Sequence, residues 1–545
     1  MSVTDRLGAG GWNICSFFVD RHLAEGRGDR VALRCGDDCV TYAELGTMID
    51  RVANVLTDLG VHRGDRVLLA LSDGVELVAS WYAAQKLGAV TAECYTFLGA
   101  KDYSYFLSYA DPAVVVADRV TIGAIREAAG QATGGSRTTL VVGAVRGVTA
   151  AAGDAAATAA ERQETALGAG EVSFEEAVAA APPAFTPVRV APDDVAIWKF
   201  TTGSTGAPKA CVHPARSPFA SFESYALGVL AMTEDDIVLP VPKLFFGYAR
   251  DLAALYPFGA GGAGIVFPER TTADRIFELI ARHRPTILVN VPTMMSAMVV
   301  HPDAGDQDLT CLRLCTSAGE ALPTEVHRKW DELFGVEVLD GMGSSEAYHV
   351  YLSIRPGTSR RGTMGVPVPG YTARIVGENG AELADGEIGR LEVTGPTMAL
   401  GYHGDDERSR RTFDGDTVRS EDLCIRDADG YFSYRGRADD LLKVGGIWVA
   451  PAEIEDCLLQ HPGVLECAVV GYSRDGLVKP RAYVVASDAA SPGLAADLLA
   501  FTRERLAGHK YPRDIRVVRD LPRTTNGKLD RSALRAAAQS ETPDS

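Results

Sequence analysis

The chain has 545 residues, more than a single hydrophobic core usually organises, which predicts at least two domains. Hydrophobic residues make up 46% of it and charged residues 23%, a balance that excludes a chain disordered throughout. The formal net charge of −18, with no local run of Lys and Arg among aromatic residues, argues against nucleic acid or an anionic membrane as a partner.

The N-terminal segment does not have the pattern of a targeting signal. Residues 1–26 lack a basic start followed by an apolar run, so we expect a cytoplasmic protein. The longest apolar stretch, 287–300, is interrupted by Asn290 and Pro292 and is too short to cross a bilayer. Ten cysteines lie scattered without the spacing of a zinc site, and we expect them to be reduced thiols.

Apolar runs of strand length alternate with helical patterns in the first part of the chain. The runs lie at 31–36, 66–72 and 114–118, and one amphipathic helix is predicted over 42–60. This alternation is typical of layered α/β structure. The stretch 143–187 is rich in Ala and poor in aromatic residues, and we expect a loosely constrained surface insertion or a helical excursion there, outside the core.

Strand and helix patterns then resume and continue toward the C-terminus. A strand is predicted at 264–267, a helix at 271–283 and a further strand at 286–292. The first domain is therefore α/β and extends to at least residue 430.

The segment 200–209 carries the strongest chemical signal. Glycines allow close backbone approach, hydroxyl and backbone N–H groups donate hydrogen bonds, and Lys209 adds a positive charge, so the loop can wrap phosphates. It differs from a Walker loop because Lys209 follows Ala-Pro and no Ser or Thr follows the lysine. A surface loop without a ligand is the alternative. The candidate nucleotide-binding residues here are Thr201, Thr202, Gly203, Ser204, Thr205 and Gly206.

Further motifs follow in a fixed order along more than 300 residues. They lie at 317–323, 340–346, Asp422, 436–446 and 522–528. With the 200–209 loop, they resemble the ANL superfamily of adenylate-forming enzymes, which comprises acyl-CoA synthetases, peptide-synthetase adenylation domains and luciferases.

The resemblance implies two domains of unequal size. Residues 1–438 would form a large adenylate-forming α/β domain of layered sheets and helices, and residues 439–545 a small α+β domain. The small domain would move about a hinge near Asp439 and carry the catalytic lysine, Lys528, to and from the active site.

The resemblance also assigns roles to the motif residues. Glu346 would bind Mg²⁺, Asp422 the ribose hydroxyls, Arg437 a phosphate or the ribose, and Lys528 would stabilise the charge that develops during adenylation. A solvated surface acid is the alternative for Glu346, and an ordinary ion-pair role is the alternative for Asp422 and Arg437. The adenine pocket would be formed by Ser317, Gly319, Glu320, Ala321, Asp340, Gly341, Met342, Gly343 and Ser345.

Within the superfamily, residues 243–248, 443–449 and His349 resemble benzoate and hydroxybenzoate CoA ligases. The resemblance implies a flat apolar site for an aromatic ring, here called the aryl slot. Its lining would be Phe246, Gly247, Tyr248, Ser317, Met342 and His349. A core role is the alternative for Phe246 and Tyr248, and a structural role for His349.

The chain departs from these ligases at three places, which limits how far their residue roles can be assigned to it: Arg250-Asp251, Ser420-Glu421 and Gly445. Arg250 either reads a polar substituent or an anion in the slot, or pairs with Asp251 at the surface. If it faces the slot, the substrate is an amino- or hydroxy-substituted benzoate or cinnamate.

The expected reaction is ATP- and Mg²⁺-dependent adenylation of an aromatic acid, followed by transfer to CoA. Transfer to the thiol of a separate carrier protein and ATP-dependent diazotisation, in which nitrite is activated for an aromatic amine, are alternatives. A non-catalytic nucleotide-binding regulator is a further alternative, which the presence of Glu346 and Lys528 disfavours. A homodimer is the expected assembly.

Overall fold

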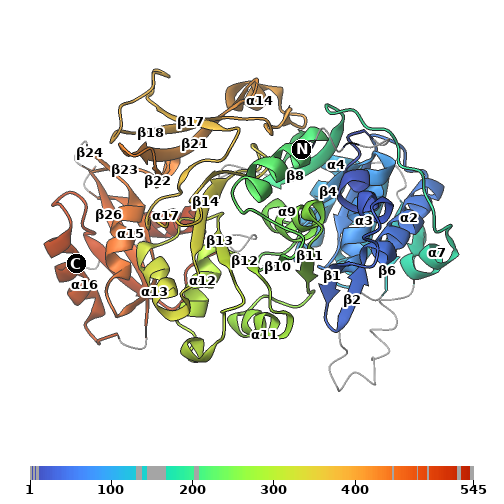
Figure 1. Cartoon of the computed structure of the whole chain (residues 1–545). Coiled ribbons are helices and arrows are strands. Elements are labelled where there is room, and N and C mark those ends of the chain that lie inside the picture. The colour runs from blue at the N-terminus through green and yellow to red at the C-terminus, as the bar shows by residue number, and fades with distance from the viewer. Residues whose placement is uncertain are drawn as a thin grey trace.

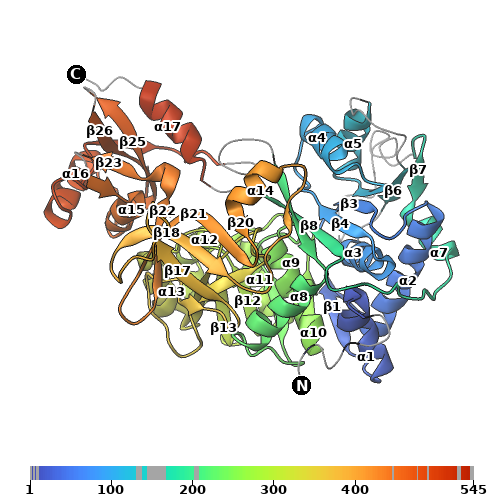
Figure 2. The ribbon, with the colours of Figure 1, turned by 90° about the horizontal axis from the view of Figure 1, so that it is seen from above.

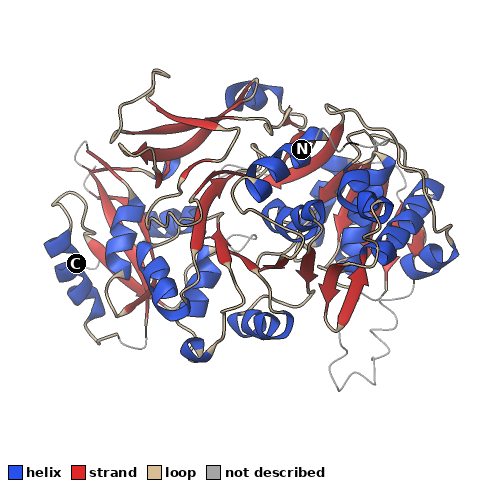
Figure 3. Ribbon diagram, viewed as in Figure 1, coloured by secondary structure: helices blue, strands red, loops and turns tan. Residues whose placement is uncertain are grey.

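The structure is a computed structural model (Figure 1). It describes Val3, Leu7 and residues 11–130, 138–143, 167–201, 208–444, 447–474, 477–487, 490–523 and 529–540. Helices and strands alternate along the described chain, as Figure 3 shows, which confirms the α/β prediction. No helix among these residues is both long and apolar enough to cross a membrane.

The first sheet is largely parallel and has the described strand order β19-β9-β8-β4-β3-β5-β6-β7. Its strands are β3 (Arg66–Ala70), β4 (Val90–Glu93), β5 (Val114–Asp118), β6 (Thr138–Val142), β7 (Glu171–Ser173), β8 (Val195–Thr201), β9 (Lys209–Pro214) and β19 (Gly401–Tyr402). The helices that accompany it are α2 (Tyr42–Asp58), α3 (Val75–Leu87), α4 (Ala100–Ala110), α5 (Ile122–Ala129) and α7 (Phe174–Ala180).

The second sheet has the described strand order β16-β15-β14-β13-β12-β10-β11-β1-β2. Its strands are β1 (Val31–Cys35), β2 (Asp38–Thr41), β10 (Ile237–Pro240), β11 (Ala263–Val266), β12 (Ile287–Asn290), β13 (Leu314–Ser317), β14 (Val338–Gly343), β15 (Val350–Ser353) and β16 (Val366–Pro367). Its helices are α8 (Arg216–Ser221), α9 (Gly247–Ala254), α10 (Tyr256–Ala260), α11 (Ala273–His283), α12 (Pro292–Val299) and α13 (Thr324–Phe334). Short helical segments are η2 (Ser16–Asp20), α1 (Arg21–Ala24), η3 (Phe222–Leu227) and η4 (Ala304–Asp306).

A third, antiparallel sheet completes the large part of the chain. It comprises β17 (Thr372–Val376), β18 (Ile388–Thr394), β20 (Phe413–Asp414), β21 (Thr417–Arg426) and β22 (Phe432–Arg437), with α14 (Asp406–Thr412) before β20. The next element is η5 (Ala438–Asp440), which contains the predicted hinge residue Asp439. A domain boundary and a rotation at this point stay predictions.

The C-terminal elements lie together at one end of the molecule (Figure 2). They are β23 (Leu442–Val444), β24 (Ile447–Val449), α15 (Pro451–Leu459), β25 (Val464–Arg474), β26 (Leu477–Ala486), α16 (Leu494–Arg505), β27 (Asp514–Val518) and α17 (Arg531–Ser540). Strands β25, β26 and β27 form a sheet whose buried residues make a core separate from that of the large sheets. This α+β unit has the small size and position that the resemblance implied.

Local sequence explains why the predicted helices form. Helix α2 starts at a capping box, in which the Thr41 side chain accepts from the backbone of Glu44 and the Glu44 carboxylate accepts from the backbone of Thr41. Its face with Leu45, Ile49 and Val52 is fully buried, as the periodicity predicts.

The Ala-rich stretch contains a helix, as one of the two expectations had it, but its described part is attached to the sheet and reaches the core. Residues 144–166 lie outside the described part, but β7 pairs with β6 and α7 contacts α2. Phe174, at the start of α7, is only 3% exposed. One buried aromatic ring and a short edge strand are enough to attach this segment to the sheet, which its composition did not reveal.

Candidate functional site

The predicted phosphate loop joins two neighbouring strands of the first sheet. Thr201 ends β8, Lys209 begins β9, and the two residues are antiparallel partners. Predicted residues Thr202, Gly203, Ser204, Thr205 and Gly206 lie outside the described part, and so does the predicted catalytic residue Lys528. Because Thr201 and Lys209 are paired, the residues at both ends of the loop are nevertheless anchored in the sheet.

Lys209 lies close to the predicted metal ligand. Its ammonium is 4.5 Å from the centroid of the Tyr402 ring, and the Tyr402 hydroxyl donates to Glu346 Oε1 at 2.7 Å. Burial lowers the pKa of Lys209, and the Glu346 carboxylate opposes that shift. Glu346 is half-buried and held by Tyr402, so it is not the freely solvated surface acid of the alternative interpretation.

The Glu346 carboxylate could serve as a magnesium ligand, because only one of its oxygens accepts from Tyr402. Only Oε1 receives the tyrosine hydroxyl, and Mg²⁺ is commonly held by one or two carboxylates together with substrate phosphates. Among the described residues, no cluster of three or more His, Cys, Asp or Glu side chains could hold a metal.

Two predicted adenine-pocket residues are neighbours at the carboxyl ends of adjacent parallel strands. Ser317 ends β13 and pairs in register with Asp340 of β14, and both are buried. Burial raises the pKa of Asp340 to about 7. Glu320 follows β13 and accepts from the hydroxyl of Thr293 at 2.6 Å. The ends of parallel strands are where α/β sheets bind ligands.

The remaining predicted pocket residues differ in exposure, and the glycines among them have structural reasons to lack a side chain. Gly319 and Ala321 are exposed, and Gly319 has φ +91°, which favours glycine. A Cβ on Gly341 would lie 2.7 Å from the carbonyl oxygen of Leu352, and one on Gly343 2.6 Å from that of His349. The close approach of β15 therefore explains these two glycines whether or not a base lies beside them. Met342 and Ser345 are half-buried.

Asp422 and Arg437 face each other across a strand pair. They are antiparallel partners on β21 and β22, which places Arg437 beside Asp422 as predicted. The Ser420 hydroxyl donates to Asp422 Oδ2 at 2.6 Å, so the unusual Ser420 orients this carboxylate. Arg437 Nε is buried without a partner among the described residues. The geometry leaves this arginine able to donate to a bound ligand.

His349 lies among three tyrosine rings at the predicted aryl slot. The ring centroids of Tyr225, Tyr248 and Tyr256 are 5.4, 5.6 and 5.0 Å from that of His349. Burial lowers the pKa of His349 to about 3, so the ring is neutral at physiological pH. Its Nε2–H donates to the carbonyl of Tyr248 at 3.4 Å, and its Nδ1 is buried without a partner among the described residues.

The slot wall on α9 combines aromatic and small residues. The hydroxyl of Tyr248 shares a hydrogen bond with that of Thr316 at 2.6 Å. The ring of Phe246 is half-buried and contacts Phe245 and Tyr95. Gly247 is the first residue of α9. Phe246, Gly247 and Tyr248 thus begin one helix, and His349 approaches it from the second sheet.

A strained turn connects the predicted metal ligand with His349. His349 N–H donates to the carbonyl of Ala347 at 2.9 Å, which closes a γ-turn, and Tyr348 at its centre has φ +71°. The Thr397 hydroxyl also donates to Ala347 O, at 2.6 Å, and Lys199 Nζ donates to Tyr348 O at 2.6 Å. Side chains from two other segments therefore hold the turn.

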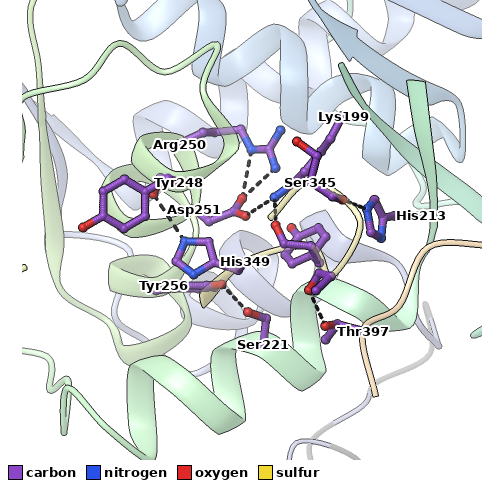
Figure 4. Close-up of polar contacts among 12 residues, drawn as sticks. Lys199, His213, Ser221, Tyr248, Arg250, Asp251, Tyr256, Ser345, His349 and Thr397 are labelled. Atoms are coloured by element: carbon purple, nitrogen blue, oxygen red, sulfur yellow. Dashed lines mark hydrogen bonds and ion pairs between the residues drawn. The ribbon is translucent and has the colours of Figure 1, made fainter. Parts of the chain in front are cut away.

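Four charged side chains lie buried beside this turn, and we call them the buried charge network: Glu93, Lys199, Arg250 and Asp251. Figure 4 shows Lys199, Arg250 and Asp251. Lys199 Nζ donates to Asp251 Oδ2 at 2.8 Å, and Arg250 Nη2 donates to Asp251 Oδ1 at 2.7 Å. Arg250 also pairs with Glu93. All four are at most 7% exposed.

Arg250 pairs with Asp251, but in the interior instead of at the surface. Its guanidinium lies 4.8 Å from the Trp81 ring centroid and borders a cavity of about 10 Å³, which has room for little more than one water molecule. Both carboxylates of the network neutralise Arg250. Direct reading of a substrate by Arg250 stays a prediction, and these contacts do not favour it.

The sequence reasoning missed Lys199 and Glu93. Lys199 lies in β8 among Ile197, Trp198 and other apolar residues, and a lysine in such a run is a signal of a buried partner. Burial lowers the pKa of Lys199 to about 8, against the attraction of Asp251. Asp251, by contrast, has its pKa lowered to about 2 by Arg250 and Lys199, in spite of burial. At pH 7 Lys199 and Asp251 are therefore both charged.

Known proteins resemble this chain over nearly its full length. The benzoate–CoA ligase of Thauera aromatica is 37% identical over 531 residues, which cover 96% of each chain. Among solved structures, an anthranilate CoA ligase in complex with anthranoyl-AMP has a TM-score of 0.89 and 32% identity, with 99% of each chain covered. A benzoate CoA ligase from Burkholderia xenovorans LB400 has a TM-score of 0.85 and 37% identity, covering 96% of this chain and 99% of the other.

Two family models match consecutive parts of the chain. The model described as AMP-binding enzyme matches residues 20–403, and the one described as AMP-binding enzyme C-terminal domain matches residues 453–528. The first match alone covers more than half of the chain and contains β8, β9 and the turn at Tyr348. The chain therefore belongs to the AMP-binding family of adenylate-forming enzymes.

Proposed function

We propose that the protein is an aryl-CoA ligase, which adenylates a substituted aromatic acid with ATP and Mg²⁺ and transfers the aryl group to CoA. One observation carries the proposal: Lys209, Glu346 and His349, from three motifs, lie around one buried turn beside the aromatic wall of α9. Relatives named as benzoate and 4-hydroxybenzoate CoA ligases, 37% identical over almost the whole chain, support the substrate class.

The reaction needs two displacements. In the first, an oxygen of the acid's carboxylate attacks the α-phosphorus of ATP and pyrophosphate leaves. In the second, the sulfur of CoA, having lost its proton, attacks the carbonyl carbon of the aryl adenylate and AMP leaves. Both steps concentrate negative charge on phosphate or carbonyl oxygens, and fixed donors that face those oxygens lower the barrier.

The chain's own residues supply those donors and fix their direction. Lys209 is partly desolvated, which strengthens its attraction for a phosphate oxygen. Glu346 is oriented by Tyr402 and would hold Mg²⁺, which would offset charge on the triphosphate. Asp422, oriented by Ser420, accepts from ribose hydroxyls, and Arg437 donates from the facing strand. The neutral ring of His349 closes the slot without adding a charge.

Pyrophosphate release measures the first step directly. The enzyme is incubated with ATP, Mg²⁺ and a panel of benzoates and cinnamates, with and without CoA, and the aryl-CoA product is identified by mass. Release that depends on one aryl acid, with aryl-CoA formed when CoA is present, supports the proposal. Pyrophosphate release that does not depend on CoA but requires nitrite and an aromatic amine would indicate diazotisation in place of the ligase reaction. No release with any acid would favour a regulator.

Glu346→Gln is the matched test of the site. It keeps the shape and the contact with Tyr402 but removes the charge, so pyrophosphate release should fall about 10²-fold or more. Glu407→Gln, an exposed glutamate whose pair with Arg411 lies on the surface, serves as the control. Equal activity of the two variants would contradict the role of Glu346.

Several finer features belong to the same proposal. Lys528 acts in adenylation and leaves the site for transfer, by rotation of residues 439–545 about the hinge near Asp439. The enzyme is a cytoplasmic homodimer, and a carrier-protein thiol in trans is the alternative acceptor. Sedimentation in solution and single-turnover transfer to CoA or to a carrier test these features separately.

A further inference from the structure

Gly247 and Lys199 share the space at the wall of the aryl slot. An ideal Cβ built on Gly247 would lie 2.6 Å from Lys199 Nζ and 2.8 Å from its Cε. The end of the lysine therefore occupies the position that a side chain at 247 would take. Any larger residue at 247 would displace the ammonium, so the glycine leaves Lys199 at the wall.

The ammonium of Lys199 is held in one place. Its oxygen acceptors among the described residues are Asp251 Oδ2 at 2.8 Å and Tyr348 O at 2.6 Å, and the Tyr348 ring centroid is 3.5 Å away. A lysine carries three N–H donors, so two oxygen acceptors leave one donor for the ring or for a ligand. Lys199 is 6% exposed, so it meets almost no solvent.

Most of the acceptor capacity of Asp251 is already used, because three donors meet a carboxylate that has about four lone-pair sites. Its Oδ1 accepts from Arg250 Nε at 3.0 Å and Nη2 at 2.7 Å, its Oδ2 accepts from Lys199, and the residue is fully buried. The group that the network presents toward Gly247 is therefore a donor with a positive charge. A ring substituent that meets it is favoured if it accepts hydrogen bonds and disfavoured if it only donates them.

From this arrangement we infer that Lys199 reads the ring substituent of the acid, and that the substrate carries an oxygen acceptor, such as a hydroxyl or a second carboxylate, in place of an amino group or no substituent. This inference rests on the proposed function and narrows it to one chemical class. Arg250 and Glu93 are then positioning residues, which fix Asp251 and through it Lys199. The partly lowered pKa of Lys199 is consistent with a cation that gains from an extra acceptor.

The test compares matched acids in the full-length enzyme. Values of kcat/KM for pyrophosphate release are measured with benzoate and with its 3- and 4-hydroxy, 3- and 4-amino and 3- and 4-carboxy derivatives. We expect kcat/KM for the best hydroxy- or carboxybenzoate to exceed kcat/KM for benzoate and for the better aminobenzoate by about tenfold or more. This is the usual effect of one hydrogen bond to a charged group. An enzyme that prefers benzoate or an aminobenzoate overturns the inference but leaves aryl adenylation intact.

Lys199→Met removes the donor and keeps much of the volume. It should reduce the preference for the oxygen-substituted acid to about threefold or less, while kcat/KM for benzoate changes much less. Lys86→Met is the matched control, because Lys86 is also a buried lysine with two oxygen acceptors, here the carboxylates of Asp20 and Asp50. The control should leave the ratio of acids unchanged even where it lowers stability.

A purely structural role for Lys199 gives a different result. It would hold the turn at Tyr348, and its loss would lower kcat for every acid by the same factor, with the ratio of acids unchanged. That outcome overturns the inference. If Lys199→Met does not fold, Gly247→Ala decides, because the added Cβ displaces the ammonium while the charge of the network stays. Gly247→Ala should also reduce the preference, and an unchanged preference overturns the inference.

Discussion

Asp251→Asn should destabilise the protein strongly, because it removes the carboxylate that two buried cations share. Asp251 is fully buried, and Lys199 and Arg250 are 6% and 5% exposed. Arg250 keeps its pairing with Glu93, whereas Lys199 loses the carboxylate that pairs with it. The amide oxygen of the new side chain can accept a hydrogen bond from only part of this group and carries no charge. Removing one partner of a buried pair typically costs about 3–5 kcal/mol, and we expect a loss of that size at pH 6.5.

The loss should shrink as the pH rises, because Lys199 can give up its proton. Its pKa in the fold is about 8, below the usual 10.5, so the unfolded chain binds more protons between these values and stability rises with pH across that window. Asp251 raises the pKa of Lys199, so its loss should lower that pKa further. In the variant, stability should therefore begin to rise with pH at a pH below 8. Between the new pKa and pH 8, the difference from the parent should fall by about 1.4 kcal/mol per pH unit.

Urea unfolding followed by tryptophan fluorescence at pH 6.5, 7.5 and 8.5 measures both effects. Glu407→Gln is the control, since its pair with Arg411 has side chains 73% and 76% exposed and should contribute less than about 1 kcal/mol. A difference between Asp251→Asn and the parent below about 1 kcal/mol at every pH would refute the reasoning about the buried charges. A large loss that does not change with pH would refute the assignment to Lys199.

Three further predictions concern the same region. Thr397→Val removes one of the two donors to Ala347 O and the hydrogen-bond partner of the buried Tyr371 hydroxyl, so it should cost about 1–3 kcal/mol in urea unfolding. Tyr402→Phe frees Glu346 from its hydroxyl donor and should raise the Mg²⁺ concentration for half-maximal pyrophosphate release several-fold in a metal titration, with little change in stability. Lys528→Ala should slow adenylation about 10²–10³-fold but leave transfer from a synthetic aryl adenylate to CoA within a few-fold in single-turnover assays.

Local sequence patterns predicted the elements that local forces determine. Helix α2 was recognisable because its apolar face repeats within 20 residues, and strands β1, β3 and β5 because each is a short apolar run. The order of strands in the sheets was not accessible in this way. It depends on pairing between segments such as β1 and β11, which are more than 200 residues apart.

The same distinction between local patterns and long-range contacts applies to the candidate site. The family resemblance proposed Glu346, Asp422 and Arg437 as site residues, whereas the contacts of Glu346 with Tyr402 and of Asp422 with Ser420 became evident only in three dimensions. The buried charge network was missed because its members come from three segments and because Arg250 and Asp251 look like an ordinary surface pair in sequence. Their burial follows from the packing of α9 against β8 and α3, which no local pattern encodes.

The energetic cost of the network indicates what its position is for. Replacing a buried group of ion pairs with well-packed apolar residues is often neutral or stabilises a protein by about 1–4 kcal/mol. The lowered pKa of Lys199 alone corresponds to a cost of about 3 kcal/mol for its charged form in the fold. A stable core therefore does not require these charges. Lys199 contacts Gly247, a residue of the predicted aryl slot, and the carbonyl of Tyr348 beside His349, so the cost is incurred where, under our proposal, a fixed donor would discriminate between substrates.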